Sequence, residues 1–261
     1  MKRIKFTKMV ASGNDFVVLE HSRGLRNLKG LAKEVCDRKY GIGADGLLLL
    51  KKMSKATSMR IFNADGSEAE MCGNGARCAA LYANLENGRL STLAGVIDTA
   101  VDGNQVRIRL TDPKEVKLGF PLRLNGMVIK ANFINTGVPH TVIFVEGLDN
   151  FDVETIGRMI RRHSRFAPRG TNVNFAETLS KNLLRIRTYE RGVEAETLAC
   201  GTGSTASALI FALMKNEDNL VKVRTQSGEI LKVYFKKYKN SLKDVWLEGG
   251  ARIVYRGEYY V

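Results

Sequence analysis

Short segments in which apolar and polar residues alternate recur throughout the chain. A two-residue period of this kind is typical of β-strands with one buried face. In the first half it predicts strands over 3–9, 16–20, 58–62, 95–101 and 105–110. Helical spacing appears over 28–38 and over 74–87, where Gly88 is expected to end the helix. The first half is therefore predicted to be strand-rich, with two helices.

The second half repeats this plan. Alternation predicts strands over 127–134, 141–145, 172–176, 184–189, 221–226, 229–236, 245–247 and 252–255. Helices are predicted over 152–163 and from Cys200 onward. Thr111-Asp112-Pro113 interrupts the pattern between the halves, which favours a domain boundary nearby. The last strands are expected to return to the first domain.

A repeated motif marks both halves. The first copy is Gly66-Ser67-Glu68-Ala69-Glu70, one further residue, and Cys72-Gly73-Asn74-Gly75. The second copy is Gly192-Val193-Glu194-Ala195-Glu196, three further residues, and Cys200-Gly201-Thr202-Gly203. Small residues then occupy several faces of each following helix, a pattern typical of helices that are buried all round, although ordinary packing on a sheet would also fit.

The repeat and the break between the halves predict the domain organisation. We expect an α+β fold of two domains, each with strands around, or packed on one side of, the helix that follows its cysteine. The N-terminal domain is predicted to comprise residues 1–114 and 249–261, and it contains Cys72. The C-terminal domain is predicted to comprise residues 115–248, and it contains Cys200.

The repeated cysteines stand where a thiol is most easily ionised. Each precedes a helix, so its sulfur lies near unpaired backbone N–H groups and the positive end of the helix dipole. This placement favours the thiolate over a free thiol, whose pKa is about 8.5. The glycines that follow allow a carboxylate to approach the backbone N–H groups closely. The motif therefore predicts a reactive cysteine beside an anion site in each half.

Two thiols that act on one carbon cannot both ionise freely. Near-attack distances of roughly 3 to 3.5 Å on either side of the carbon place the sulfurs about 7 Å apart. Two thiolates would then repel by roughly 2 kcal/mol at an effective dielectric constant near 20. The pair should therefore hold one proton between them, and one thiolate facing one thiol is what a two-base proton transfer requires.

A lone cysteine is more often a small core residue, and we interpret Cys36 and Cys78, which lack the repeated context, in this way. The duplicated context instead favours a chemical role for Cys72 and Cys200. The chain has only three histidines, and none lies at a short spacing from a cysteine that would suit zinc. We therefore expect no metal site.

Composition narrows the function further. Of the 261 residues, 44% are hydrophobic and 26% are charged, which is ordinary for a globular protein. The longest apolar stretch, 208–214, is far shorter than the roughly 18 residues that span a bilayer, so no transmembrane helix and a cytoplasmic location are expected. The formal net charge is +14, but basic residues are interleaved along strands and match no nucleic-acid module. A solvated basic surface is therefore favoured over a nucleic-acid partner.

Ordered motifs along nearly the whole chain resemble the diaminopimelate epimerase family. These motifs are Lys8-Met9, Gly13-Asn14-Asp15-Phe16, Gly41-Ile42-Gly43-Ala44-Asp45-Gly46, Phe62-Asn63-Ala64-Asp65-Gly66-Ser67, Met71-Cys72-Gly73-Asn74-Gly75-Ala76-Arg77-Cys78, Asn135-Thr136-Gly137-Val138-Pro139-His140, Gly170-Thr171-Asn172-Val173-Asn174-Phe175, Tyr189-Glu190-Arg191-Gly192 and Cys200-Gly201-Thr202-Gly203. The family is independent of pyridoxal phosphate and serves lysine and cell-wall biosynthesis. An ordered set is far more specific than any single motif.

The resemblance implies two pseudo-symmetric domains, each a strand-rich, barrel-like sheet around a central helix. It also implies an active site in the cleft between them. It implies that Cys72 and Cys200 are the catalytic acid and base, with His140 and Glu190 tuning them. Substrate-binding positions carry over to Asn14, Asn63, Gly73, Asn74, Asn172, Glu190, Arg191, Gly201 and Thr202. The resemblance also implies a homodimer and no cofactor.

Each of these polar residues also has an ordinary structural interpretation. Asn14 and Asn63 stand in turn-like sequences, where asparagine is common. Glu190 and Arg191 could form a surface ion pair, and His140 could be a hydrogen-bonded loop residue. The ordered match favours the functional interpretation in each case.

Two departures from the family pattern concern the distal end of the substrate. Some members have Gln where this chain has Gly46, and Asn where it has Val138. The ligands of the distal end are therefore not carried over to these two positions.

The ordered motifs and the paired cysteines together predict a diaminopimelate epimerase that exchanges LL- and meso-diaminopimelate by two-base proton transfer at Cα. The nearest alternative is a two-cysteine racemase of the same fold that acts on another amino acid, such as histidine or hydroxyproline. A non-catalytic protein that binds nucleic acid or senses thiols is a more remote alternative.

Overall fold

The computed structural model describes residues 3–22, 24–217, 219–238 and 241–260. The chain divides into two compact units, which we call unit 1 (residues 1–108 and 249–261) and unit 2 (residues 109–248). The predicted boundary after residue 114 therefore differs from that of the structure. Residues 109–114 belong to unit 2 because the Leu110 N–H donates to the Val245 carbonyl at 2.9 Å. Residues 1, 2, 23, 218, 239, 240 and 261 of the predicted domains lie outside the described residues.

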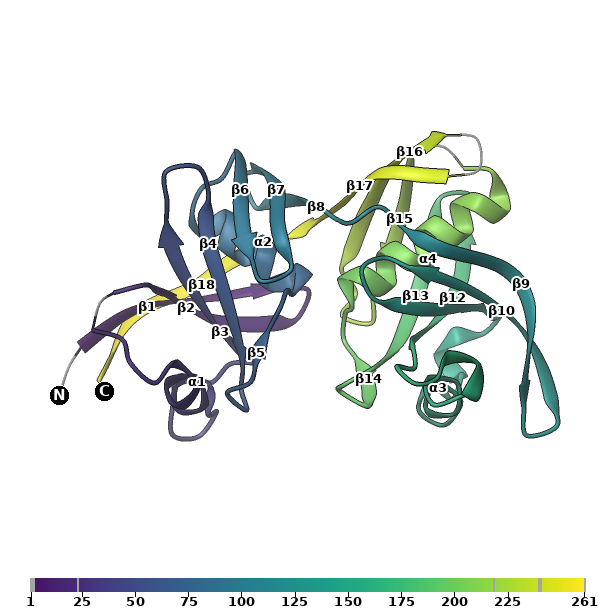
Figure 1. The fold of residues 1–261 in the computed structure, drawn as a ribbon, viewed down its shortest axis with the longest axis horizontal. Coiled ribbons are helices and arrows are strands. Elements are labelled where there is room, and N and C mark those ends of the chain that lie inside the picture. Colours follow the sequence, from purple (N-terminus) through teal and green to yellow (C-terminus); the bar gives the residue numbers. More distant parts are fainter. Residues whose placement is uncertain (1–2, 23, 218, 239–240, 261) are drawn as a thin grey trace. The chain divides into compact units, whose positions relative to one another are not determined.

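Unit 1 is a mixed sheet with two helices (Figure 1). Its elements are β1 (Arg3–Ala11), β2 (Asn14–Glu20), α1 (Leu28–Cys36), β3 (Gly46–Lys52), β4 (Thr57–Asn63), β5 (Glu68–Ala69), α2 (Gly73–Tyr82), β6 (Asn87–Thr92), β7 (Gly95–Asp102), β8 (Gln105–Arg109) and β18 (Arg252–Tyr260). The strands pair in the order β18-β1-β2-β3-β4-β6-β7-β8. The pairs β2–β3 and β4–β6 are parallel, and short β5 pairs with β4.

Unit 2 has the same plan. Its elements are β9 (Lys114–Leu124), β10 (Met127–Asn135), β11 (Pro139–Phe144), α3 (Val153–Arg161), β12 (Asn172–Ser180), β13 (Leu183–Glu190), β14 (Ala195–Thr197), α4 (Gly201–Lys215), β15 (Leu220–Arg224), β16 (Ile230–Tyr238) and β17 (Ser241–Gly250), with 3-10 turns at Leu148–Asn150 and Ser164–Phe166. The strands pair in the order β9-β10-β11-β12-β13-β15-β16-β17, with β14 on β13. The parallel pairs β11–β12 and β13–β15 match those of unit 1.

The two sheets share one strand order, but their first strand is supplied in different ways. In unit 2, β9 runs directly into its partner β10 through Asn125-Gly126. In unit 1 the equivalent strand is β18, which comes from the far end of the chain and pairs with β1 from Arg3↔Tyr260 to Val10↔Arg252. The duplication is therefore complete at the level of strands, but one strand has changed its place in the chain order.

The two helices that follow the cysteines are enclosed by their sheets. Every residue of α2 from Asn74 to Ala80 is buried, and the helix contacts strands on several sides. In α4 the run from Gly203 to Ala212 is buried throughout, and Figure 1 shows the helix beside β12, β13 and β15. The small residues allow strands to approach each helix from all sides. The predicted central helices and the α+β fold class are confirmed.

The other helix of each unit covers the outer face of the sheet. In unit 1, Leu31 and Val35 of α1 pack against Leu47 and Leu49 of β3. In unit 2, α3 packs in the same way against Val173 and Phe175 of β12, within a core that also holds Tyr189. Each sheet is therefore covered on both faces, with the cysteine helix inside and the other helix outside.

Several elements differ from the sequence-based expectation. Strand β3 was not predicted, because its run Leu47–Leu50 is buried on both faces and does not alternate. Strand β9 was not predicted because most of it is exposed. Helix α2 ends at Tyr82 rather than near Asn87, because Asn84 adopts a left-handed backbone conformation, and Gly88 lies in β6. Strands β5, β6 and β14 were also missed.

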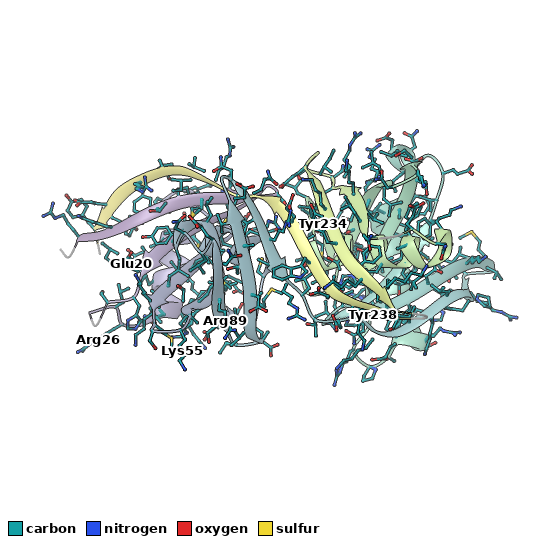
Figure 2. All side chains as sticks on the ribbon, turned by 90° about the horizontal axis from the view of Figure 1, so that it is seen from above. Glu20, Arg26, Lys55, Arg89, Tyr234 and Tyr238 are labelled. Carbon is teal, nitrogen blue, oxygen red and sulfur yellow. The ribbon has the colours of Figure 1, made fainter. Side chains whose placement is uncertain are left out.

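Basic side chains are exposed on loops as well as on strands of unit 1. Arg26, Lys55 and Arg89 are exposed at separate places on unit 1 (Figure 2). Among the residues that the structure describes, no helix is long and apolar enough to cross a membrane.

Candidate active site

Both repeated cysteines are N-cap residues of the enclosed helices. Cys72 precedes α2 and Cys200 precedes α4, each with extended backbone dihedral angles (φ −139° and −119°). Neither side chain caps its own helix, so the first backbone N–H groups of both helices remain available for a ligand. Cys200 is buried, with 7% of its surface exposed, whereas Cys72 is half-buried.

A short hairpin holds each cysteine against the sheet. In unit 1, Arg60 on β4 binds Glu68 on β5 through two hydrogen bonds of 2.6 and 2.9 Å. In unit 2, Arg187 on β13 binds Glu196 on β14 through two hydrogen bonds of 2.7 and 2.6 Å. Two parallel hydrogen bonds between one guanidinium and one carboxylate fix the relative position of two strands. The segment that leads to each cysteine is therefore tied to the centre of its sheet.

These ion pairs correct the alignment of the two motifs. Phe62 pairs with Glu68 in unit 1, and Tyr189 pairs with Glu196 in unit 2, so Glu68 corresponds to Glu196. Both acids lie four residues before their cysteine, with no insertion. The sequence comparison had instead matched Glu68 with Glu194, through the shared letters Gly-x-Glu-Ala-Glu. The extra residue of unit 2 lies in the turn that precedes Glu196, not next to Cys200.

Glu190 lies next to Cys200 within unit 2. Its carboxylate accepts a hydrogen bond from the Thr197 hydroxyl at 3.0 Å and another from the Cys200 thiol. Burial raises the pKa of the Glu190 carboxyl above its usual range, and these two hydrogen bonds act in the opposite direction. The Cys200 sulfur also lies 3.5 Å from the Thr202 hydroxyl. Cys200 thus has a titratable carboxyl and a hydroxyl beside it.

His140 is completely buried on β11. Its Nδ1 lies 3.1 Å from the amide nitrogen of Asn174, and its Nε2 has no hydrogen-bond partner among the described residues. Burial, with the charge of Arg191 as a second cause, lowers the pKa of His140 to about 3. The imidazole is therefore neutral at physiological pH.

Asn172 organises the corner that carries Glu190 and Arg191. Its side-chain oxygen accepts from the Arg191 backbone N–H at 2.8 Å, and its amide donates to the Pro139 carbonyl at 3.2 Å. It also pairs with His140 across the parallel ladder. The Arg191 guanidinium donates to the Arg169 carbonyl at 3.4 Å. The structure therefore brings together the five predicted site residues Cys200, His140, Asn172, Glu190 and Arg191 at one end of unit 2.

In unit 1 the predicted residues occupy the matching places. Asn63 ends β4, as Glu190 ends β13, and its amide donates to the Ser67 hydroxyl at 2.9 Å. Asn14 begins β2, and its buried side-chain oxygen has no hydrogen-bond partner among the described residues. Asn74 lies in the first turn of α2.

Sequence analysis did not single out Arg77. Its guanidinium is completely buried and donates to the Ser12 hydroxyl at 2.6 Å and to the Asn74 side-chain oxygen at 2.9 Å. It thus ties the β1–β2 turn, which carries Asn14, to the first turn of α2. The available signal was an arginine among the small residues of the first turns of the helix.

Each of the two departures from the family pattern corresponds, through the duplication, to an asparagine in the other unit. Gly46 corresponds to Asn172 of unit 2. Gly46 pairs with Phe16 of β2 and lies beside β4, as Asn172 pairs with His140 of β11 and lies beside β13. A Cβ at Gly46 would lie 3.0 Å from the Phe62 carbonyl oxygen. Val138 corresponds to Asn14, because each lies two residues before the paired Phe16 or His140. Each unit therefore has one apolar residue where its counterpart offers an amide.

Comparison with known proteins decides the family. The family model described as diaminopimelate epimerase matches residues 6–117 and 132–251. A protein named diaminopimelate epimerase from Aquifex aeolicus is 43% identical over 277 aligned positions, covering 97% of each chain. The chain belongs to the diaminopimelate epimerase family. This confirms the prediction from the ordered motifs, and with it an isomerase class.

Solved structures of other members of the fold support the architecture alone. A phenazine biosynthesis protein of the PhzF family from Bacillus anthracis matches with a TM-score of 0.77 and 19% identity, covering 100% of both chains. A hydroxyproline epimerase from Agrobacterium vitis matches with a TM-score of 0.68 and 14% identity, covering 99% of this chain and 91% of the other. The diaminopimelate epimerase family thus shares its fold with proteins that bear different functional names.

Proposed function

We propose that this chain is a diaminopimelate epimerase that interconverts LL- and meso-diaminopimelate without a cofactor. One observation carries the proposal. Each half of a duplicated fold ends a hairpin with a cysteine at the N-terminus of an enclosed helix, in a chain of this family. Two thiols in matched positions suit a reaction that needs a base on one face of a carbon and an acid on the other.

In the proposed mechanism one cysteine is a thiolate and the other a thiol. The thiolate takes the Cα proton, and the electron pair of the broken C–H bond moves onto the substrate carboxylate as an enediolate. The electron pair of the enediolate then returns to Cα and takes the proton of the opposite thiol on the other face. A new C–H bond forms with inverted configuration, and the opposite cysteine is left as a thiolate. Which of Cys72 and Cys200 is the base depends on the isomer bound. The enzyme ends each turnover with the two protonation states exchanged.

The Cα proton is a weak acid, so the enediolate must be stabilised. The helix N-termini at Gly73-Asn74 and Gly201-Thr202 supply backbone N–H groups and a positive dipole end for this charge. These donors are fixed in place by helices that are enclosed in their sheets, so little reorganisation is needed when the charge forms. His140 and Glu190 are proposed to tune the thiol of Cys200, since Glu190 contacts it directly.

Substrate selection is proposed to rest on the polar residues around these helices. Diaminopimelate carries two amino acid groups, and Asn14, Asn63, Asn172 and Arg191 offer the amide and guanidinium groups that would bind them. The unpartnered buried oxygen of Asn14 fits a substrate ammonium group. A substrate that lacks the second amino acid group would leave such atoms unpaired, which costs binding energy.

The decisive experiment is turnover of LL-diaminopimelate in D2O. The native enzyme should form meso-diaminopimelate and incorporate deuterium at Cα, as followed by mass spectrometry and chiral chromatography. Cys72→Ala and Cys200→Ala should each abolish epimerisation, because each removes one of the two proton-transfer groups. Cys36→Ala, which removes a buried thiol elsewhere in unit 1, is the matched control and should remain active. Full epimerisation by either Cys72→Ala or Cys200→Ala would refute the proposal.

The residues at Gly46 and Val138 favour one second candidate, a racemase of the same fold for another amino acid. Neither residue offers the side-chain amide that some family members have at these positions, so fewer polar groups are available for a distal amino acid group. A substrate panel of diaminopimelate, histidine and 4-hydroxyproline separates the two candidates. A higher kcat/KM for either of the last two would assign the chain to the second candidate.

We also propose a cytoplasmic homodimer. Among the described strands, β18 pairs only with β1, and its residues Ile253, Val254 and Tyr255 are exposed. An exposed apolar edge strand is a ready surface for a second copy of the chain. Light scattering after gel filtration should give twice the monomer mass, and Val254→Lys should reduce it to the monomer mass. A monomeric native protein would exclude this assembly.

A further inference from the structure

The duplication contains one set of positions that is polar in unit 2 and apolar in unit 1. His140, Asn174 and Thr188 of unit 2 correspond to Phe16, Leu48 and Ile61 of unit 1. The strand ladders establish this correspondence, because Asn174 pairs with Val142 and Thr188, as Leu48 pairs with Val18 and Ile61. The fold can therefore form this layer from apolar residues. The polar set of unit 2 calls for a reason other than folding.

Both sets lie against the first turn of the cysteine helix. A Cβ added to Gly75 would lie 3.2 Å from side-chain atoms of Ile61 and Leu48 and 3.6 Å from Phe16. A Cβ added to the equivalent Gly203 would lie 2.3 Å from the side-chain oxygen of Asn174 and 3.3 Å from the Cβ of Cys200. The amide of Asn174 thus packs against Gly203, three residues after Cys200.

The neighbours of Asn174 fix the orientation of its amide. The Thr188 hydroxyl lies 3.0 Å from its oxygen and donates to it. The Thr141 carbonyl lies 3.3 Å from its nitrogen, and a carbonyl can only accept. The NH2 group therefore faces Thr141, and its second hydrogen donates to Nδ1 of His140 at 3.1 Å.

This orientation determines where the single proton of His140 resides. A neutral imidazole has one donor nitrogen and one acceptor nitrogen. Because Nδ1 accepts from Asn174, the proton must be on Nε2. This Nε2–H is buried and has no partner among the described residues, and such a donor is costly unless a ligand or an anion receives it.

We propose that Asn174, oriented by Thr188, is a positioning residue that holds His140 in the Nε2–H tautomer. The imidazole then offers a hydrogen-bond donor, and not an acceptor, to a ligand or to the negative charge that forms during the reaction. This inference rests on the proposed epimerase function. It adds two residues, Asn174 and Thr188, that do not touch substrate and act through His140. It also accounts for the polar set of unit 2, since unit 1 has Phe16 where unit 2 has His140.

The tautomer can be measured without reference to activity. In the 15N-labelled native protein, the side-chain signals of His140, identified by their absence from His140→Phe, should show a non-protonated Nδ1 and a protonated Nε2. In Asn174→Asp the carboxylate can only accept, so Nδ1 should become the protonated nitrogen. A protonated Nδ1 in the native protein would overturn the proposal.

Activity supplies the second readout. Asn174→Asp should lower kcat for diaminopimelate by about 10²- to 10⁴-fold, the upper limit being the loss known for an inverted catalytic histidine tautomer. Asn132→Asp is the matched control, because Asn132 is equally buried in unit 2, and its side chain bonds the Gly119 N–H and the Val142 carbonyl and not His140. Its kcat should stay within about threefold of native. An inverted tautomer with unchanged kcat in Asn174→Asp would overturn the proposal.

A third variant separates positioning from folding. The triple replacement His140→Phe, Asn174→Leu and Thr188→Ile installs the residues of unit 1 and should fold with native-like circular dichroism, yet lose epimerisation. Retained epimerisation in a folded triple variant would overturn the proposal. If the native enzyme does not act on diaminopimelate at all, the proposed function fails, whereas the 15N measurement still decides the tautomer of His140.

Discussion

At the scale of single residues, the two cysteines share a backbone position but not an environment. Cys200 is buried, contacts Glu190 and lies close to Asn174, which binds His140. The places that correspond to Glu190 and His140 in unit 1 hold Asn63 and Phe16, neither of which can titrate. The asymmetry inferred from charge repulsion between two thiolates is therefore matched by an asymmetry in the neighbouring side chains.

The buried His140 should make the protein sensitive to acid. Its pKa is lowered to about 3 by burial, whereas an unfolded histidine titrates near 6.5. Stability due to the neutral ring is therefore fully present above pH 6.5 and is lost as the pH falls toward 3. Between pH 7 and pH 4 this one group should cost about 3 kcal/mol of unfolding free energy.

Urea denaturation of the native protein and of His140→Phe at pH 7 and pH 4 checks this prediction. The loss of unfolding free energy on acidification should be smaller in the variant by about that amount. His21→Asn, at an exposed histidine of unit 1, is the control and should lose as much as the native protein. An equal loss in His140→Phe would contradict the assignment of a buried neutral ring.

At the scale of elements, the hairpins before the cysteines should differ in strength. Arg187 and Glu196 have only 15% and 18% of their side chains exposed, whereas Arg60 and Glu68 have 42% and 21%. Glu196→Gln leaves a more buried guanidinium without its partner, so it should cost about 2 kcal/mol of unfolding free energy. Glu68→Gln should cost less than about 1 kcal/mol. Thermal and urea denaturation of the two variants test this order, and a reversed order would contradict it.

The two helix glycines offer a second paired test. Gly75→Ala meets only the ends of flexible side chains at 3.2 Å, and alanine favours helix by about 1 kcal/mol, so its stability should change little. Gly203→Ala would place its Cβ 2.3 Å from the Asn174 oxygen, so the amide must move. We expect a cost of about 1–3 kcal/mol.

Gly203→Ala should also lower kcat through the displaced Asn174, whereas Gly75→Ala should retain most of it. Unfolding free energies and kcat measured for both variants check the prediction. Equal kcat values for the two would indicate that the Asn174 amide can shift without consequence.

At the scale of the whole molecule, sequence patterns predicted the alternating strands, the enclosed helices and the repeat. They failed where the physical cause is not local. Leu47–Leu50 does not alternate because both faces of β3 are covered, and a reader of the sequence alone cannot see the second cover. The role of Asn174 depends on partners at Thr188 and His140, which only strand register brings together. The sequence comparison aligned Glu68 with Glu194 because the two segments share residue types. Strand pairing, which the sequence does not reveal, aligns Glu68 with Glu196.

The position of β18 at the far end of the chain should not be needed for unit 1 to fold. In unit 2, β9 and β10 are joined by Asn125-Gly126, both with positive φ (41° and 84°), as a tight hairpin turn requires. In unit 1, Arg3 pairs with Tyr260, so the ends of β1 and β18 are already neighbours. A direct Asn-Gly link from Tyr260 to Arg3 should therefore recreate the hairpin of unit 2.

A circular permutant tests this prediction. It carries the Asn-Gly link and is opened between Thr111 and Asp112, where the chain forms neither helix nor strand. Each unit is then nearly continuous in sequence, and no described strand pair is lost, so the permutant should fold and turn over diaminopimelate within about threefold of native. A permutant with the same link but opened between Leu48 and Leu49 interrupts the buried strand β3 and should not fold. If the first permutant also does not fold, the separation of β18 from β1 along the chain is a requirement of folding. The two units would then be equivalent in their strand order but not in how they fold.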